Sequence, residues 1–187
     1  MSLIDDLLDD TREHMDKSVE ATRGKFGSIR TGRASPALLD RIVVDYYGAP
    51  TPLRQLATIS APEARLLTVQ PYDKSSIKAI ERAIMESDLG LTPNNDGSII
   101  RLQIPELTEE RRKQLVKVVR GLTEEGKVAL RNIRRDVMHD LKELRDAGEA
   151  GADDEHRAEE ALQKLTDDKV KELDALLKGK EAEILEV

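Results

Sequence analysis

Apolar side chains recur at steps of three or four residues near both ends of the chain, whereas the middle is organised differently. Over residues 3–29 this spacing predicts one amphipathic helix with a single buried stripe. The same period returns after Pro105 and predicts a helix over 108–146, roughly 60 Å long at the usual rise per residue. A loop at 147–154 separates it from another amphipathic helix. The two ends of the chain therefore predict three long helices.

Two glycines interrupt the pattern of the second long helix. In a helix interior, Gly121 and Gly126 each cost about 1 kcal/mol relative to alanine, which weakens the prediction of one continuous helix. Gly126 falls on the apolar stripe, where a missing side chain would let a partner helix approach closely. We therefore expect a close helix–helix contact at this position.

The middle of the chain predicts a small module of short strands and one helix. Runs of β-branched residues predict the strands, and a segment with one apolar face predicts a helix that ends near Gly90. Residues 94–97 (NNDG) predict a tight turn, because asparagine, aspartate and glycine tolerate positive φ. The predicted strands span 41–46, 53–60, 65–70 and 98–104, with turns at 48–52 and 61–63 and a helix that opens at Asp73 or Ser75.

Together these elements predict an α+β protein in which a small β/α/β domain is inserted into an elongated three-helix bundle. Residues 1–30 and 105–187 form the bundle in this prediction, and residues 31–104 form the small domain. The chain then crosses between the two parts twice, near 30–33 and 103–105. We therefore expect a two-segment hinge, which permits bending but limits free tumbling.

Composition narrows the class of protein. Only 2% of the residues are aromatic and none is cysteine, so the core must be aliphatic, and disulfides and thiolate metal sites are excluded. The N-terminus (MSLIDDLLDD) is acidic and does not resemble a signal peptide. No apolar run approaches the roughly 20 residues that a bilayer crossing needs. We expect a cytoplasmic protein without a membrane partner.

Charge is distributed unevenly. The formal net charge is -7, yet residues 111–145 hold 11 basic and 5 acidic side chains. With Val137 placed at 0° and about 100° per residue, nine of these basic side chains fall between about +60° and +160°, and acidic ones such as Glu125 and Asp140 fall on the opposite flank. We call this flank of positive charge the basic ridge. Its members are Lys113, Lys117, Arg120, Lys127, Arg131, Arg134, Arg135, Lys142 and Arg145.

Three interpretations of the basic ridge are open. Its side chains could pair with carboxylates of the neighbouring helices, or they could face an acidic protein in a structural scaffold. Helices adapted only to water mix charge signs for i,i+4 pairing, however, and arginine binds phosphate bidentately. The scarcity of aromatic residues argues against base stacking. The ridge therefore favours recognition of folded RNA through phosphates and shape.

No catalytic or metal-binding constellation is visible. The segment 121–128 approaches the phosphate-binding pattern G-x-x-x-x-G-K-[ST], but Val128 has no hydroxyl for magnesium and the segment lies in a helical pattern. His14, His139 and His156 are far apart and lack ligand spacing. We expect no enzymatic activity, no metal and no cofactor.

Several short segments carry a more specific pattern. They are RTGRASPALL (30–39), PYDK (71–74), SDLGL (87–91), DG (96–97), LTEERR (107–112), RNIRRD (131–136) and QKLT (163–166). In order and density they resemble the bacterial ribosome recycling factor family over essentially the whole chain.

The resemblance implies an L-shaped protein that binds the post-termination ribosome in the space that tRNA normally occupies. With elongation factor G and GTP hydrolysis, such a protein helps to split the subunits, so that mRNA and tRNA can leave. The implied partners are the ribosome, its large-subunit RNA and elongation factor G, and we expect the protein to act as a monomer.

The resemblance also implies particular contact residues. The family uses bundle arginines of the segment that matches 131–135, which indicates Arg131 and Arg134 first and Arg135 next. The helical-wheel argument adds Lys127, Arg120, Lys117 and Lys142 as further RNA-binding residues. At the hinge we expect Arg30, Gly32, Arg33 and Pro105, although Gly32 and Pro105 fit a helix stop and a helix start equally well.

Overall fold

The structure is a computed structural model, it describes residues 2–186, and it divides into two units. The first unit comprises the residues up to Arg23 together with Leu115–Glu181. The second comprises Gly24–Gln114 and the residues from Ala182 on, so that it includes the ends of the long helices.

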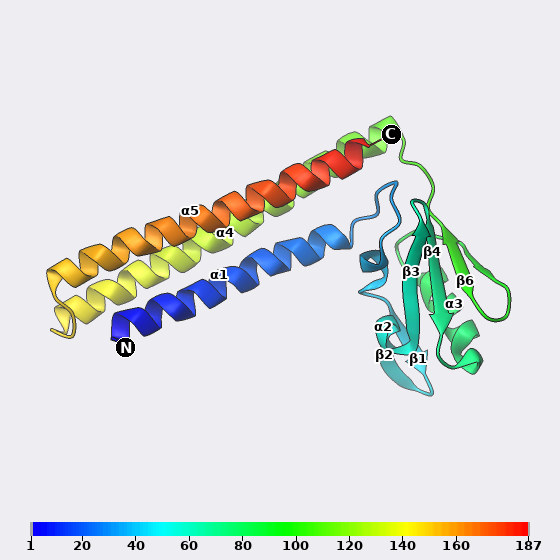
Figure 1. Cartoon of the computed structure of the whole chain (residues 1–187), viewed down its shortest axis with the longest axis horizontal. Coiled ribbons are helices and arrows are strands. Elements are labelled where there is room, and N and C mark those ends of the chain that lie inside the picture. The colour runs from blue at the N-terminus through cyan, green and yellow to red at the C-terminus, as the bar shows by residue number, and fades with distance from the viewer. Residues whose placement is uncertain (1, 187) are drawn as a thin grey trace. The chain divides into compact units, whose positions relative to one another are not determined.

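Three long helices run through the chain, as predicted from the apolar spacing (Figure 1). The loop at 147–151 joins two antiparallel helices, and Gly148 in this loop adopts a φ of +74°. The Gly148 N–H donates to Arg145 O and the Glu149 N–H to Leu144 O, which ends the preceding helix in a glycine-based C-cap. The three helices are α1 (Leu3–Gly27), α4 (Glu109–Asp146) and α5 (Ala152–Leu185).

Side chains at the helix starts satisfy otherwise unpaired backbone N–H groups. The Thr108 hydroxyl accepts a hydrogen bond from the Arg111 N–H at 3.1 Å, and the Ser2 hydroxyl accepts one from the Asp5 N–H at 3.1 Å. Such caps contribute about 1 kcal/mol each. The expected helix start at Thr108 is therefore confirmed by its capping contact.

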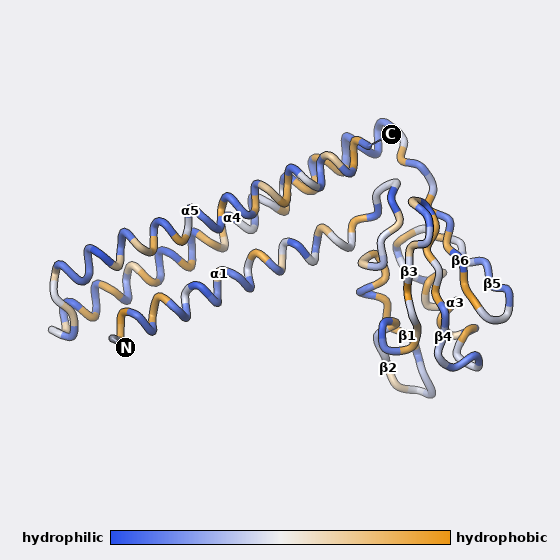
Figure 2. Tube along the Cα trace, in the orientation of Figure 1, coloured by the Kyte–Doolittle hydropathy of each residue, from blue (hydrophilic) through white to orange (hydrophobic). Residues whose placement is uncertain are grey.

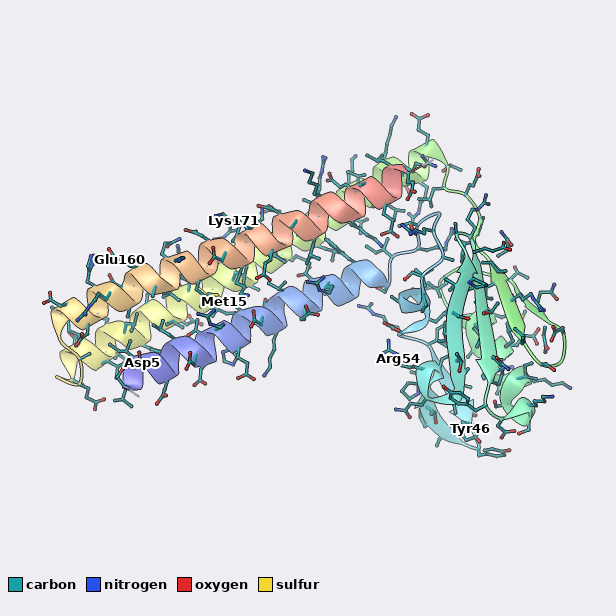
Figure 3. All side chains as sticks on the ribbon, in the orientation of Figure 1. Asp5, Met15, Tyr46, Arg54, Glu160 and Lys171 are labelled. Atoms are coloured by element: carbon teal, nitrogen blue, oxygen red, sulfur yellow. The ribbon has the colours of Figure 1, made fainter. Side chains whose placement is uncertain are left out.

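The core of the first unit is an aliphatic seam between α1, α4 and α5. Figure 2 shows apolar positions recurring at helical spacing along all three helices. Met15 of α1 is fully buried (Figure 3), whereas charged side chains such as Glu160 and Lys171 lie on the exposed surface of α5. The buried residues of this core are Met15, Val19, Leu130, Val137, Leu141, Ala158, Leu162, Leu165 and Leu173.

Gly126 lies at a close approach of the three helices. A Cβ atom added there would be 2.7 Å from Thr22 Oγ1 of α1 and 3.1 Å from Leu173 Cδ1 of α5. Real Cβ contacts essentially never fall below 3.0 Å. The predicted close helix–helix contact at this glycine is confirmed.

Polar groups inside the first unit are satisfied locally or by ion pairs. Buried threonines donate to the carbonyl four residues earlier, as Thr123 does to Val119 O at 2.8 Å. Between α5 and α1, Lys169 Nζ lies 2.5 Å from Asp16 Oδ1, and its side chain is only 12% exposed. Hydrogen bonds to Asp16 and then to Glu172 raise the pKa of Lys169.

The second unit is built on an antiparallel four-stranded sheet with the order β3-β4-β6-β5 and a separate hairpin, β1-β2. Alternate strand residues such as Leu67, Val69 and Leu102 are fully buried, and they belong to the same core as Ile80 and Ile84 of the helix α3. The elements are η1 (Pro36–Leu39), β1 (Val43–Tyr46), β2 (Ala49–Pro52), α2 (Leu53–Leu56), β3 (Ala57–Glu63), β4 (Leu66–Pro71), η2 (Lys74–Ser76), α3 (Ile77–Glu86), β5 (Pro93–Asn95) and β6 (Ile100–Gln103).

The structure corrects the prediction of a strand over 53–60. Its first four residues form the helical turn α2, and only the part from Ala57 on is strand. Leu53 and Leu56 are three residues apart and both are buried, which a helical turn permits and an alternating strand does not. In a run this short, burial of those two leucines decided the backbone conformation.

The predicted turns are also shorter than expected. The turn placed at 48–52 is confined to Tyr47 and Gly48, with φ values of +51° and +81°, and Ala49–Pro52 is the second strand of the hairpin. Prolines are tolerated there because β2 pairs on one side only. Residues 61–63 lie within β3, where the register shifts between Ser60 and Glu63, and the turn to β4 is at Ala64 and Arg65.

Candidate nucleic-acid interface

One edge of the basic ridge of α4 lies at the seam with α5, while other members, such as Lys117 and Arg131, are exposed. Three of its members form salt bridges to carboxylates of that helix, which is the first of the three interpretations left open by the sequence. The charges of these three side chains are therefore already compensated within the first unit. The pairs are Arg120–Glu181 (2.6 Å), Lys127–Asp174 (2.8 Å) and Arg145–Glu155 (2.9 Å).

For two of these cations, Lys127 and Arg145, neighbouring carboxylates favour the charged form. A hydrogen bond to Asp174 is the main cause that raises the pKa of Lys127, and its side chain is only 19% exposed. A hydrogen bond to Asp146, followed by the charge of Glu155, raises the pKa of Arg145. Lys127 is therefore largely covered at the seam, whereas Arg145 is paired with Glu155 but still exposed.

A second set of ridge side chains has no carboxylate partner. Lys117, Arg131 and Lys142 are exposed and form no ion pair with any residue from 2 to 186. Arg134 donates from Nη1 to Oε1 of Gln163 on α5 at 2.8 Å, so its partner is a neutral amide. We call these four residues the open cations.

Arg135 lies between the two sets. Its side chain is 73% exposed and lies 3.4 Å from the carboxylate of the adjacent Asp136. Exposed ion pairs of this kind contribute between zero and about 1 kcal/mol, so this contact does not prevent Arg135 from binding an anion.

The open cations and Arg135 could bind phosphate groups. Arg131, Arg134 and Arg135 lie within five residues of one helix, where the rise is about 1.5 Å per residue, so their guanidinium groups originate close together. Guanidinium groups bind phosphate through paired N–H donors. The seam therefore offers a compact arginine group in the middle of α4, with Lys117 and Lys142 on either side along the helix.

The residues expected at the hinge all lie in the second unit. α1 ends at Gly27 and α4 begins at Glu109, so Gly32 and Pro105 are not the residues that stop or start a helix. Arg30 Nη1 is buried without a hydrogen-bond partner in the described part of the chain.

Sequence reasoning missed a contact beside the predicted hinge. Thr31 is buried, and its hydroxyl donates to Glu183 Oε1 at 2.9 Å and accepts from the Arg33 N–H at 3.2 Å. Its partner lies 152 positions away in the sequence, so no local spacing could have indicated this contact. The contact of Gln163 with Arg134 was not predicted either, because Gln163 entered the sequence analysis only as part of the segment QKLT (163–166).

Other surface features do not assemble a reactive site. A hollow of about 720 Å³ lies over β1 and α3 and includes Arg41, Asp45 and Arg82. Within residues 2–186, no three His, Cys, Asp or Glu side chains are placed to hold a metal ion. In the same part of the chain, no helix combines the length and apolarity that a membrane crossing needs.

The fold and the ridge define a class: a long-helix bundle that carries a small β-sheet unit and a strip of cations along one helix seam. Comparison with known proteins places the chain more narrowly. The sequence profile described as "Ribosome recycling factor" matches residues 22–185. The chain belongs to the ribosome recycling factor family, as its short segments indicated.

Individual relatives agree with this assignment. The chain is 58% identical to the ribosome-recycling factor of Rubrobacter xylanophilus, covering 96% of this chain and 97% of the relative. It is 54% identical to that of Geobacillus sp. strain WCH70, covering 99% and 100%.

Solved structures are similar over their full length. A solution structure of the ribosome recycling factor matches with a TM-score of 0.79 and 40% identity, and each chain is covered completely. The T. thermophilus ribosome recycling factor, in a set of models with E. coli elongation factor G bound to the E. coli post-termination complex, matches with a TM-score of 0.70, 48% identity and complete coverage of both chains.

Proposed function

We propose that this chain recycles ribosomes after translation termination. It binds the post-termination ribosome and, with elongation factor G and GTP, promotes separation of the subunits and release of mRNA and tRNA. The chain itself catalyses no reaction and requires no cofactor. The full-length match to ribosome recycling factors, one of them placed with elongation factor G on a post-termination complex, carries this proposal. The place of action is the bacterial cytoplasm, and the acting species is a monomer.

In this proposal, the bundle (residues 1–30 and 105–187) binds large-subunit ribosomal RNA through the basic ridge. Arg131 and Arg134 contact phosphate first, since neither has a carboxylate partner in the described chain. Arg135 and the open lysines at 117 and 142 extend the contact. Arg120 and Lys127 can join only by exchanging their α5 carboxylates for phosphate, so their contribution is smaller.

In this proposal, the small domain (residues 31–104) receives the movement of elongation factor G. Bending at the segments that contain Arg30, Gly32, Arg33 and Pro105 transmits the movement of elongation factor G to the RNA-bound bundle. The burial of an unpaired Arg30 nitrogen supports this assignment, because an unsatisfied buried donor costs free energy in one arrangement and can find a partner in another.

The alternative function is RNA binding without recycling, which the basic ridge alone would also allow. The two are separated by incubating purified post-termination ribosomes with this chain, elongation factor G and GTP, and following subunit separation by light scattering. We expect splitting beyond that given by elongation factor G and GTP alone. A chain that binds the large subunit but adds no splitting would refute the recycling function and leave the alternative.

A further inference from the structure

Four cations of the basic ridge contact side chains of α5 within the described chain, and one of these contacts differs in chemistry. Arg120, Lys127 and Arg134 follow one another at intervals of seven residues, so they occupy the same position on the helix face. The first two end on carboxylates of α5, and so does Arg145. Arg134, the fourth, ends on an amide, that of Gln163.

The amide of Gln163 has two partners with opposite roles. Its Oε1 accepts from Arg134 Nη1 at 2.8 Å, while its Nε2 donates to Asp167 Oδ1 at 2.9 Å. The carboxylate of Asp167 orients the amide, since only Nε2 can donate to it and Oε1 must then face the arginine. Asp167 lies seven residues before Asp174, the partner of Lys127, and so occupies the α5 position that would supply a carboxylate to Arg134.

This arrangement fixes the direction of Arg134 without compensating its charge. The Arg134 side chain is half-buried, and one N–H is used by a neutral oxygen. A guanidinium has five N–H donors, so the remaining ones can bind a phosphate. A carboxylate at the same place would form a charge-assisted pair that competes with phosphate.

We propose that Gln163 is a positioning residue for RNA binding: it holds the Arg134 guanidinium at the seam and keeps it from pairing with Asp167. The carboxylates along the rest of the seam fasten α4 to α5, whereas the amide at 163 preserves one oriented, uncompensated arginine. This inference rests on the proposed binding of ribosomal RNA by Arg134.

The decisive variant is Gln163→Glu, which keeps the shape of the side chain and supplies a carboxylate. We expect large-subunit affinity to fall roughly tenfold, the order of one lost charge-assisted contact. The slope of log affinity against log salt should become shallower by about 0.7–0.9, as for one phosphate contact fewer. Urea unfolding should show a bundle about as stable as the parent, because the ion pair gained with Arg134 is offset by the lost hydrogen bond to Asp167 and by repulsion between the two carboxylates.

The control for added charge is Ala175→Glu, an exposed position elsewhere on α5. It changes the net charge equally but leaves Arg134 untouched, so we expect a smaller loss of affinity and the parental stability. Equal affinity losses for Ala175→Glu and Gln163→Glu would overturn the inference, since net charge alone would then explain both.

A second variant tests the shielding of Asp167. Gln163→Met removes the amide without adding charge, which frees Asp167 to capture Arg134, so affinity should again fall. Adding Asp167→Asn should restore it, and failure to restore would overturn the shielding. Arg134→Ala separates the RNA site from its positioning residue. If Arg134→Ala binds the large subunit like the parent, the proposed RNA site fails. If Arg134→Ala weakens binding but the Gln163 variants do not, only the positioning role of Gln163 fails.

Discussion

The close approach at Gly126 permits a quantitative test of the bundle. Replacing a helix-interior glycine by alanine stabilises a helix by about 1 kcal/mol through backbone propensity alone. At Gly126 the new Cβ would lie 2.7 Å from Thr22 Oγ1, and Thr22 and Leu173 are 5% and 0% exposed, so neither can move into solvent. Overpacking a well-packed core in this way costs about 1–3 kcal/mol.

Gly121 provides the matched control in the same helix. A Cβ added there meets nothing within 4 Å, so Gly121→Ala should stabilise the bundle by up to about 1 kcal/mol. Gly126→Ala gains the same propensity but incurs the steric cost. The difference in unfolding free energy between the two variants therefore isolates the packing contribution, for which we expect about 1–3 kcal/mol.

The assay is urea unfolding followed by far-ultraviolet circular dichroism, a signal dominated by the long helices. The double variant Thr22→Ala with Gly126→Ala removes the nearest atom and should recover part of the loss, leaving only the 3.1 Å contact to Leu173. If Gly126→Ala proved as stable as Gly121→Ala, the three helices would not approach each other at this residue, and the packing assigned to Gly126 would be incorrect.

Three further predictions concern binding, pH and the small sheet. Arg134→Glu should abolish most large-subunit binding in a filter or sedimentation assay. Its unfolding free energy should change by no more than about 0.5 kcal/mol, because the side chain lies beside the core. Binding as tight as that of the parent would refute the site. The pKa of Lys169 is raised above its ordinary 10.5, mainly by Asp16, so its stabilising contribution is complete below pH 10.5 and is lost as pH rises through the higher folded value. The urea midpoint should accordingly fall less above pH 10.5 in Lys169→Met than in the parent, and identical pH profiles would contradict this. Gly97 has a φ of +93°, so Gly97→Ala should destabilise the second unit by about 1–2 kcal/mol. The measurement is the protection of the β5 and β6 amides against hydrogen exchange, which Gly121→Ala, as the control, should leave unchanged.

The long helices could be predicted almost to the residue. The α4 helix was expected over 108–146 and spans Glu109–Asp146. The prediction succeeded because a single apolar periodicity runs through these 38 residues, with the Thr108 cap before it and Gly148, in the left-handed region, after it. Local sequence also indicated Gly126 as a contact, since a glycine on an apolar stripe weakens its own helix but lets a neighbouring helix approach. The small unit was less predictable. In α2, two buried leucines decided between helix and strand over four residues, which is too short for any period to be visible.

The sequence by itself determined that positive charge is sorted onto one flank of the longest helix, because side-chain direction in a helix follows from residue number alone. It could not determine which of those charges are compensated within the protein. Only the tertiary structure brought α5 alongside, so that Arg120, Lys127 and Arg145 met carboxylates while Arg134 met the Gln163 amide. Pairing between side chains tens of residues apart depends on the register of two packed helices, and that register is set by the whole core rather than by any local pattern.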